Sequence, residues 1–142
     1  MANKANRSFM SWALWIAQTL LALLFLMSGV SKLFSPVELL SDQFAPLPGM
    51  FMRFIGAIEV LGAVGLILPV LLRMLPFLTL WAAVGLLVEM VAATTFTLIY
   101  VDASMAVFPL VAAVLCAFVA YGRWRVVPLG SRMHPTPPLA GT

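Results

Sequence analysis

Apolar residues run through most of the chain in four long blocks, and charged, polar, proline and glycine residues gather in the short segments between them. The blocks cover about residues 12–34, 54–72, 77–100 and 105–121. Each is close to the roughly 20 apolar residues that a helix needs to cross a bilayer. The pattern therefore predicts four membrane-spanning helices.

The composition agrees with a membrane protein. The chain has 142 residues, of which 63% are hydrophobic and 9% are charged, and its mean hydropathy is +1.10. A soluble domain usually carries about 25% charged residues, and one small core cannot bury so much apolar surface. We expect a single all-α domain over residues 1–125, an integral membrane four-helix bundle. Residues 126–142 are rich in proline and polar residues and should form a weakly ordered tail.

Basic residues are divided unequally between the two sides that this topology creates. The first apolar block is too long for the apolar region of a signal peptide, so we interpret it as a retained span. An excess of Lys and Arg marks the cytoplasmic side, which predicts that both termini are cytoplasmic. The basic pI of about 9.6 follows from these flanks and does not indicate a nucleic-acid partner. The cytoplasmic side would hold Lys4, Arg7, Arg73, Arg123, Arg125 and Arg132, and the other side Lys32 and Arg53 with three acids.

Two carboxylates interrupt the apolar blocks. Glu59 lies in RFIGAIEVLGAVGLILPVLL, and Glu89 lies in AAVGLLVEMVAATTF. Each has small residues three and four positions away on a helix, and small residues mark faces where membrane helices approach closely. Both acids should therefore point at another helix. The predicted helix-packing positions are Gly29, Gly56, Gly62, Ala63, Gly85 and Ala92.

The first span adds an amide and a cation on one face. Gln18 and Lys32 are 14 residues apart, which is close to four helical turns. Lys32 lies near the outer end of its span, where its side chain could reach Glu59 or extend to water. Glu59 and Glu89 lie roughly 9 and 13 Å from the outer ends of their spans. We predict a buried polar cluster of Lys32, Glu59 and Glu89, with Gln18 nearer the inner side.

Two interpretations of this cluster stay open. The acids could be neutral and hydrogen-bonded, or Glu59 could pair with Lys32 only to fix the helix register. An ionised acid inside the membrane costs on the order of 3 kcal/mol on insertion scales, so such residues also mark ligand sites and proton pathways. The aromatic residues leave a similar choice, because Trp15 and Trp81 could anchor the interface or line a pocket.

The sequence lacks the residues that metal centres, disulfides and common catalytic sites require. The single histidine, His134, lies in the tail, and the single cysteine, Cys116, lies inside an apolar block. This set cannot ligate a haem, copper or iron–sulfur centre, and it allows no intramolecular disulfide. No nucleotide-binding motif or nucleophile–base pair is present. We therefore expect no metal site, no catalytic residues and no covalently bound cofactor.

Three stretches resemble the DoxX-like family of small four-span bacterial membrane proteins. They are WIAQTLLALLFLMSGVSKLF in the first span, IGAIEVLGAVGLILP in the second, and YGRWR after the fourth. In the third span, Thr97 stands where relatives often carry a His, and Glu89 is particular to this chain. The resemblance implies a helical bundle in the bacterial inner membrane. It also implies a link to respiratory redox complexes, because the family is named after a subunit of a quinone-linked oxidoreductase.

Taken with the polar cluster, the resemblance predicts a non-haem accessory subunit of a quinone-linked membrane oxidoreductase, inactive alone and in contact with quinone. Its partners would be the bilayer and either other membrane subunits or further copies of itself. One alternative is a structural or assembly role, in which the polar cluster serves only helix packing. A second is a small proton-coupled carrier, although the small multidrug transporters have their essential acid in the first span and the first span here has Gln18 and no acid.

Overall fold

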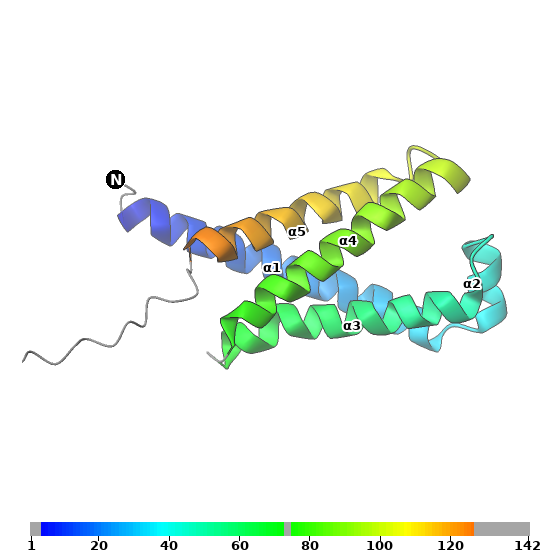
Figure 1. Ribbon diagram of the computed structural model, residues 1–142, viewed down its shortest axis with the longest axis horizontal. Helices are drawn as coiled ribbons and strands as arrows, with labels where there is room; N and C mark the ends of the chain where they lie inside the picture. Colours follow the sequence, from blue (N-terminus) through cyan, green and yellow to red (C-terminus); the bar gives the residue numbers. More distant parts are fainter. Residues whose placement is uncertain (1–3, 73–74, 127–142) are drawn as a thin grey trace, which may run out of the picture.

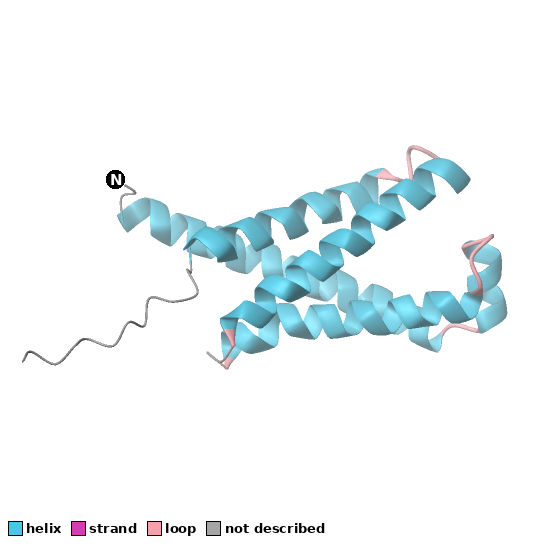
Figure 2. Ribbon diagram, in the orientation of Figure 1, coloured by secondary structure: helices cyan, strands magenta, loops and turns pink. Residues whose placement is uncertain are grey.

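The computed structural model describes residues 4–72 and 75–126, and within them it contains only helices, turns and loops (Figure 2). The prediction of an all-α chain is confirmed. The predicted tail, apart from Val126, and Arg73 lie outside the described residues. The helices are α1 (Lys4–Phe34), α2 (Val37–Gln43), α3 (Gly49–Leu71), α4 (Pro76–Tyr100) and α5 (Val107–Val126).

The four long helices form a ring in the order α1, α3, α4, α5. Helices α1 and α4 each pack against both α3 and α5, so they lie diagonally across the bundle from each other. The start of α1 and the end of α5 lie at one end of the bundle, which we call the terminal end, and α2 lies at the other, the α2 end (Figure 1). Toward the α2 end, α4 and α5 diverge from α1 and α3 in this view.

The outward faces of the long helices are apolar. Met27, Leu61 and Val114, from three different helices, are 72%, 71% and 61% exposed. A soluble monomer does not leave such large apolar faces open to water, and all four helices are long and apolar enough to cross a membrane. The outward faces therefore contact lipid. The core between the helices contains Ala17, Leu21, Phe25, Ala63, Leu66, Ala83, Leu86, Met90, Ala112, Ala113, Cys116 and Val119.

The helices extend beyond the apolar blocks that predict them. Helix α1 begins at Lys4, before its apolar block, and α5 continues through Arg123 to Val126. Hydrophobicity marks the part of a helix that lies in the hydrocarbon, while the backbone hydrogen bonds continue into the polar region. Pro109 falls in the first turn of α5, where backbone N–H groups have no partner within the helix, so it does not break the helix.

The longest connection, predicted as an irregular or partly interfacial loop, contains the short helix α2. Pro36 precedes its first turn. The Ser41 hydroxyl accepts a 2.9 Å hydrogen bond from the Gly49 backbone N–H, which joins α2 to the start of α3. Leu40 and Met52 are buried at this contact. These contacts hold α2 against α3 at the end of the bundle.

Glycines set the distance between α1 and α3. A Cβ atom added at Gly29 would lie 2.6 Å from the carbonyl oxygen of Gly56, and one added at Gly56 would lie 2.8 Å from the Cβ of Lys32. The two backbones can approach this closely only because both positions lack a side chain. Gly62 packs closely against α4, since a Cβ atom added there would lie 2.7 Å from a methyl carbon of Leu86. Ala63, next to it, is buried.

Helix α4 differs from the predicted packing. Gly85 is exposed, with nothing within 4 Å of an added Cβ, and Ala92 is exposed as well. On a helix, Gly85 and Ala92 lie to one side of Glu89, because they are four residues before it and three after it. The residues three before and four after it lie to the other side. Leu86 and Ala93, on that second side, face the bundle. Within the described bundle, in contrast to the prediction, Gly85 and Ala92 therefore do not pack between helices.

Candidate functional site

An ion pair between α1 and α3 lies near the α2 end. The Lys32 Nζ atom donates a 2.7 Å hydrogen bond to Glu59 Oε1, and the two side chains are 16% and 2% exposed. The Ser28 hydroxyl also donates to the Glu59 carboxylate, at 3.1 Å from Oε1. Ser28 and Lys32 are one turn apart on α1, so both can face the same carboxylate. The sequence left two directions for the Lys32 side chain, toward Glu59 or out to water, and in the structure it reaches Glu59.

Close packing produces this pairing. Because Gly29 and Gly56 bring α1 against α3, the Lys32 side chain leaves its helix directly beside α3. Glu59 follows Gly56 by three residues and lies on the same face of α3. A buried charged pair is tolerated in a low-dielectric site only when its hydrogen-bonding groups are matched closely. Ser28 was not predicted as part of the cluster, although its position one turn before Lys32 indicates it.

A cavity of about 530 Å³ lies beside this pair, between α3, α4 and the α2 segment. Its walls are mainly aromatic and aliphatic, and Lys32 and Glu89 are the charged residues among them. Gln43, Phe51 and Ala92 line the cavity and are exposed, so it opens to the surroundings. The remaining lining residues are Phe44, Leu47, Met52, Ile55, Met90, Ala93, Phe96, Thr97, Val101 and Met105.

Glu89 is the unsatisfied group of this cavity. Both of its carboxylate oxygens are buried, and neither has a hydrogen-bond partner among the described residues. Thr97, which also lines the cavity, donates its hydroxyl to the Ala93 carbonyl of its own helix. An ionised carboxylate without a partner is costly in apolar surroundings. Glu89 therefore needs either a bound proton or a ligand that supplies a hydrogen bond.

The structure brings together part of the predicted cluster. Lys32 and Glu59 are in direct contact, and Lys32 and Glu89 line one cavity without a hydrogen bond between them. Gln18 is in a different place, roughly 21 Å along α1 from Lys32. It is completely buried, and its Oε1 atom accepts hydrogen bonds from Nε and Nη2 of Arg123 on α5.

Gln18 also joins α1 to α3. Its Nε2 atom donates a 2.7 Å hydrogen bond to the backbone carbonyl of Leu66. A backbone carbonyl has two lone pairs, so the Leu66 carbonyl can accept a hydrogen bond from another helix in addition to one within α3. Gln18 connects three helices, α1, α3 and α5, at the terminal end.

Arg123 was predicted only as a loop charge that sets orientation. In the structure it lies on the last turns of α5 and turns back into the bundle. Its guanidinium carbon also lies 5.8 Å from the centre of the Trp15 ring. A buried amide in the first span, which needs a partner, was the signal that could have identified it.

The fold and the pairing of Lys32 with Glu59 define a class of protein. It is a helical membrane protein with four spans, a buried acid–base pair and an adjoining apolar cavity. The sequence model of the DoxX-like family matches residues 16–119, so the chain belongs to this family. The match covers most of the four-helix bundle and confirms the resemblance seen in the first two spans. Comparison with curated proteins and with solved structures found no match.

Proposed function

We propose that this protein is a non-haem accessory subunit of a quinone-linked membrane oxidoreductase, and that the cavity at the α2 end receives the quinone head group. The observation that carries the proposal is the unpartnered Glu89 carboxyl in an apolar cavity that also contains Lys32. Ligand sites combine apolar walls with a few convergent polar groups, and their volumes are typically about 300–1,000 Å³. The cavity of about 530 Å³ lies within that range.

The polar groups suit a flat, neutral ligand with two carbonyl oxygens. Lys32 uses one of its three N–H donors on Glu59, so donors remain that can bind a ligand oxygen. Glu89 can hold a proton and donate it as a hydrogen bond to a second oxygen. Because Glu59 neutralises Lys32, the cavity presents directed hydrogen bonds without a net charge from the pair. Phe44, Phe51 and Phe96 supply aromatic surface for a ring.

The residues of the cavity support the proposed accessory role in three ways. A bound quinone takes up two electrons and two protons on reduction; in this proposal a redox-active partner subunit supplies the electrons, and both protons come from the aqueous phase, one of them by way of Glu89. Lys32 orients the ligand, the aromatic walls exclude water from it, and Glu89 holds a proton near it. Among the described residues, no group of three or more His, Cys, Asp or Glu could hold a metal ion.

Binding of a short-chain quinone to the purified, delipidated protein tests the proposal. Ala92→Leu places a larger side chain in the cavity wall, and Glu89→Gln keeps the shape but removes the exchangeable proton. We expect each to lower affinity by about tenfold. Val91→Leu, next to Ala92 but outside the cavity, and Glu38→Gln, on the exposed surface of α2, are the controls. Wild-type protein that binds no quinone would contradict the proposal.

The partner is tested separately, by affinity capture from native membranes in a mild detergent. Recovery of redox-active subunits with the wild-type chain, together with quinone in the lipid extract, supports the accessory role. Recovery of the chain with neither rules it out. The ion pair itself favours one alternative, because Lys32 and Ser28 together satisfy the Glu59 carboxylate and can fix helix register without a ligand. Under that structural role, Glu89→Gln would leave the activity of every captured partner unchanged.

The proposal places the protein in the bacterial inner membrane with both termini in the cytoplasm. The support is the excess of Lys and Arg in the terminal segments. Alkaline phosphatase is active only outside the cytoplasm, so a fusion after Asp102 should be active and a fusion at the C-terminus inactive. The reverse pattern would invert the orientation and leave the cavity on the cytoplasmic side.

A further inference from the structure

The acidic side chains of the chain lie away from the positive charge at the terminal end. The five acids are Glu38 and Asp42 on α2, Asp102 in the turn after α4, and the intramembrane pair Glu59 and Glu89. None lies at the end where α1 begins and α5 ends. Arg123 forms no salt bridge with any described residue; the ion pair that the described residues form joins Lys32 to Glu59, at the α2 end.

Arg123 is nevertheless held in a fixed position. Its Nε and Nη2 atoms donate to the completely buried Gln18, which is itself anchored to the Leu66 carbonyl. The Trp15 ring lies 5.8 Å from the guanidinium carbon. A guanidinium has five N–H donors, so most remain after the two bonds to Gln18. A positioned, half-buried guanidinium with spare donors is suited to a planar or tetrahedral oxyanion.

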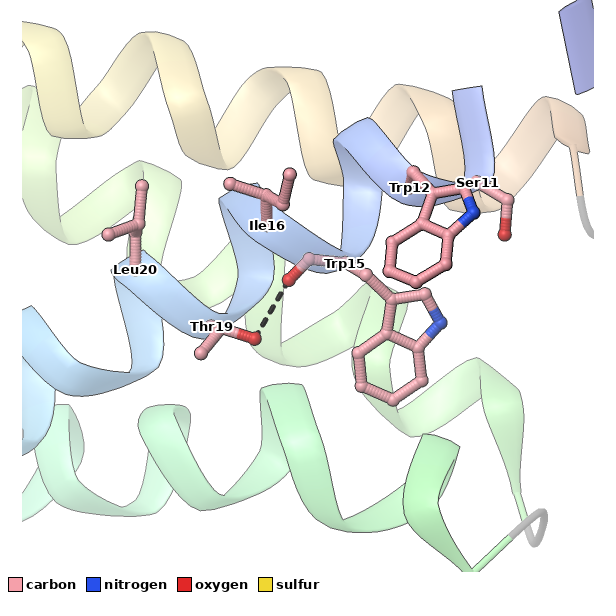
Figure 3. Close-up of a pocket in the computed structure, with 6 residues that line it drawn as sticks. All are labelled: Ser11, Trp12, Trp15, Ile16, Thr19 and Leu20. Atoms are coloured by element: carbon pink, nitrogen blue, oxygen red, sulfur yellow. Dashed lines mark hydrogen bonds between the residues drawn. The ribbon is translucent and has the colours of Figure 1, made fainter. Parts of the chain in front are cut away.

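Two apolar grooves are lined by Trp15, whose ring lies beside this cation. One, of about 480 Å³, lies between α1 and α3 and is lined from Trp15 to Leu26 on α1 and from Leu71 back to Ala63 on α3. A second, of about 680 Å³, follows the outer face of α1 from Ser11 to Leu20 (Figure 3). Both are lined by Trp15 and Thr19. The Thr19 hydroxyl donates a hydrogen bond to the Trp15 backbone carbonyl, so that hydroxyl is already bonded within its own helix (Figure 3).

We propose that the terminal end binds a phospholipid with an anionic headgroup, whose phosphate contacts Arg123 and whose acyl chains lie in the two grooves beside Trp15. The charge of Arg123 indicates an anionic ligand, because a cation without an acidic side chain nearby favours an anion. The grooves indicate that this anion belongs to a lipid, because two adjoining apolar channels suit a molecule with two acyl chains. Tryptophan at this position agrees with the membrane interface, where headgroups lie.

Lipid selection by the purified protein tests this site. The full-length chain is reconstituted in phosphatidylcholine with a minor share of phosphatidylglycerol, extracted gently, and its bound lipids are quantified. We expect phosphatidylglycerol to be enriched about tenfold over the bulk mixture. Arg123→Gln should abolish the enrichment. Arg125→Gln removes the same charge from an exposed position on the same helix and should retain it.

Other outcomes overturn the proposal. Bound lipid at the bulk ratio in wild type means that no anionic lipid site exists. An equal loss in Arg123→Gln and Arg125→Gln indicates only a general surface potential. Loss of the enrichment in excess inorganic phosphate indicates a site for a free anion and not for a lipid.

A second pair of variants leaves Arg123 unchanged, in case Arg123→Gln does not assemble. Thr19→Trp fills the wall shared by both grooves and should remove the enrichment. Met27→Trp adds the same side chain to an exposed position on α1 outside both grooves and should not. If Thr19→Trp kept the phosphatidylglycerol enrichment as fully as Met27→Trp, the grooves would hold no bound lipid.

Discussion

The two ends of the bundle use buried polar residues in opposite ways. At the α2 end, Lys32 is neutralised by Glu59, and the group that lacks a partner is the Glu89 carboxyl. At the terminal end, Arg123 is bound by the neutral amide of Gln18, so its charge is positioned but not cancelled. The first arrangement suits a neutral ligand that accepts and donates hydrogen bonds, and the second suits an anion. Hydrogen-bond satisfaction and charge neutralisation are therefore separate properties of a buried site.

The largest effect should come from separating the ion pair. Lys32→Met leaves the Glu59 carboxylate buried without its cation, and breaking one partner of such a pair costs about 3 kcal/mol or more. We expect a large loss in the free energy of unfolding, measured by denaturant titration in micelles. The double variant Lys32→Met with Glu59→Leu should recover most of it, because it leaves no unpaired charge. A small effect of the single variant would mean that the pair contributes little.

At the terminal end, Gln18→Leu should lower the free energy of unfolding by less than Lys32→Met does. It removes the acceptor for Arg123 and the donor to the Leu66 carbonyl, and lost bonds of this kind cost about 1–3 kcal/mol. The guanidinium can turn toward water, so we expect about 2 kcal/mol. Thr19→Val is the control, because that hydroxyl is exposed and bonded within its own helix. If Gln18→Leu were as costly as Lys32→Met, the contrast between the two ends would fail.

Glycines at the two ends should also differ. Ala at Gly29 would meet the backbone of Gly56, whereas the atoms nearest to an Ala at Gly122 belong to the side chain of Leu14. Overpacking costs about 1–3 kcal/mol, and each change gains up to about 1 kcal/mol of helix propensity. We expect a net loss of about 1 kcal/mol for Gly29→Ala and less for Gly122→Ala, by thermal unfolding. Gly85→Ala, which meets nothing, should be neutral or stabilising.

The smallest effect concerns Asp102, outside the membrane at the α2 end. The backbone N–H and the hydroxyl of Ser104 donate to its carboxylate and lower its pKa below the usual 3.8. Because the folded pKa is the lower one, this contribution is present above about pH 4 and is lost as the pH falls through the folded pKa. Asp102→Asn should lower the unfolding temperature slightly at neutral pH and not in stronger acid. An equal difference at both pH values would exclude this linkage.

Much of the fold could be predicted from the sequence because the bilayer constrains it so strongly. A run of about 20 apolar residues in lipid must be helical, since every backbone polar group needs a partner. The four spans and the family follow from such runs and from the motifs of the first two. The ends of α1 and α5 and the short helix α2 did not follow, because polar segments carry no comparable constraint.

The candidate site could be predicted only in part. The small residues around Glu59 indicate a close helix contact and therefore a partner on α1. Around Glu89, small residues occur on both sides, and spacing alone does not choose the side that faces the bundle. The structure chooses Leu86 and Ala93, and this rotation leaves Gly85 exposed and places Glu89 at the edge of the cavity.

By itself, then, the sequence determined that this chain is a four-span membrane protein with two acids and a lysine in the apolar region, because hydrophobicity, length and small-residue spacing are local properties. Only the tertiary structure decided which polar groups meet. Lys32 pairs with Glu59 because glycines let α1 and α3 approach, and Gln18 pairs with Arg123 because α5 packs on α1 in the ring. Which side chains meet depends on the rotation and order of whole helices, and these are fixed by contacts between residues far apart in the chain.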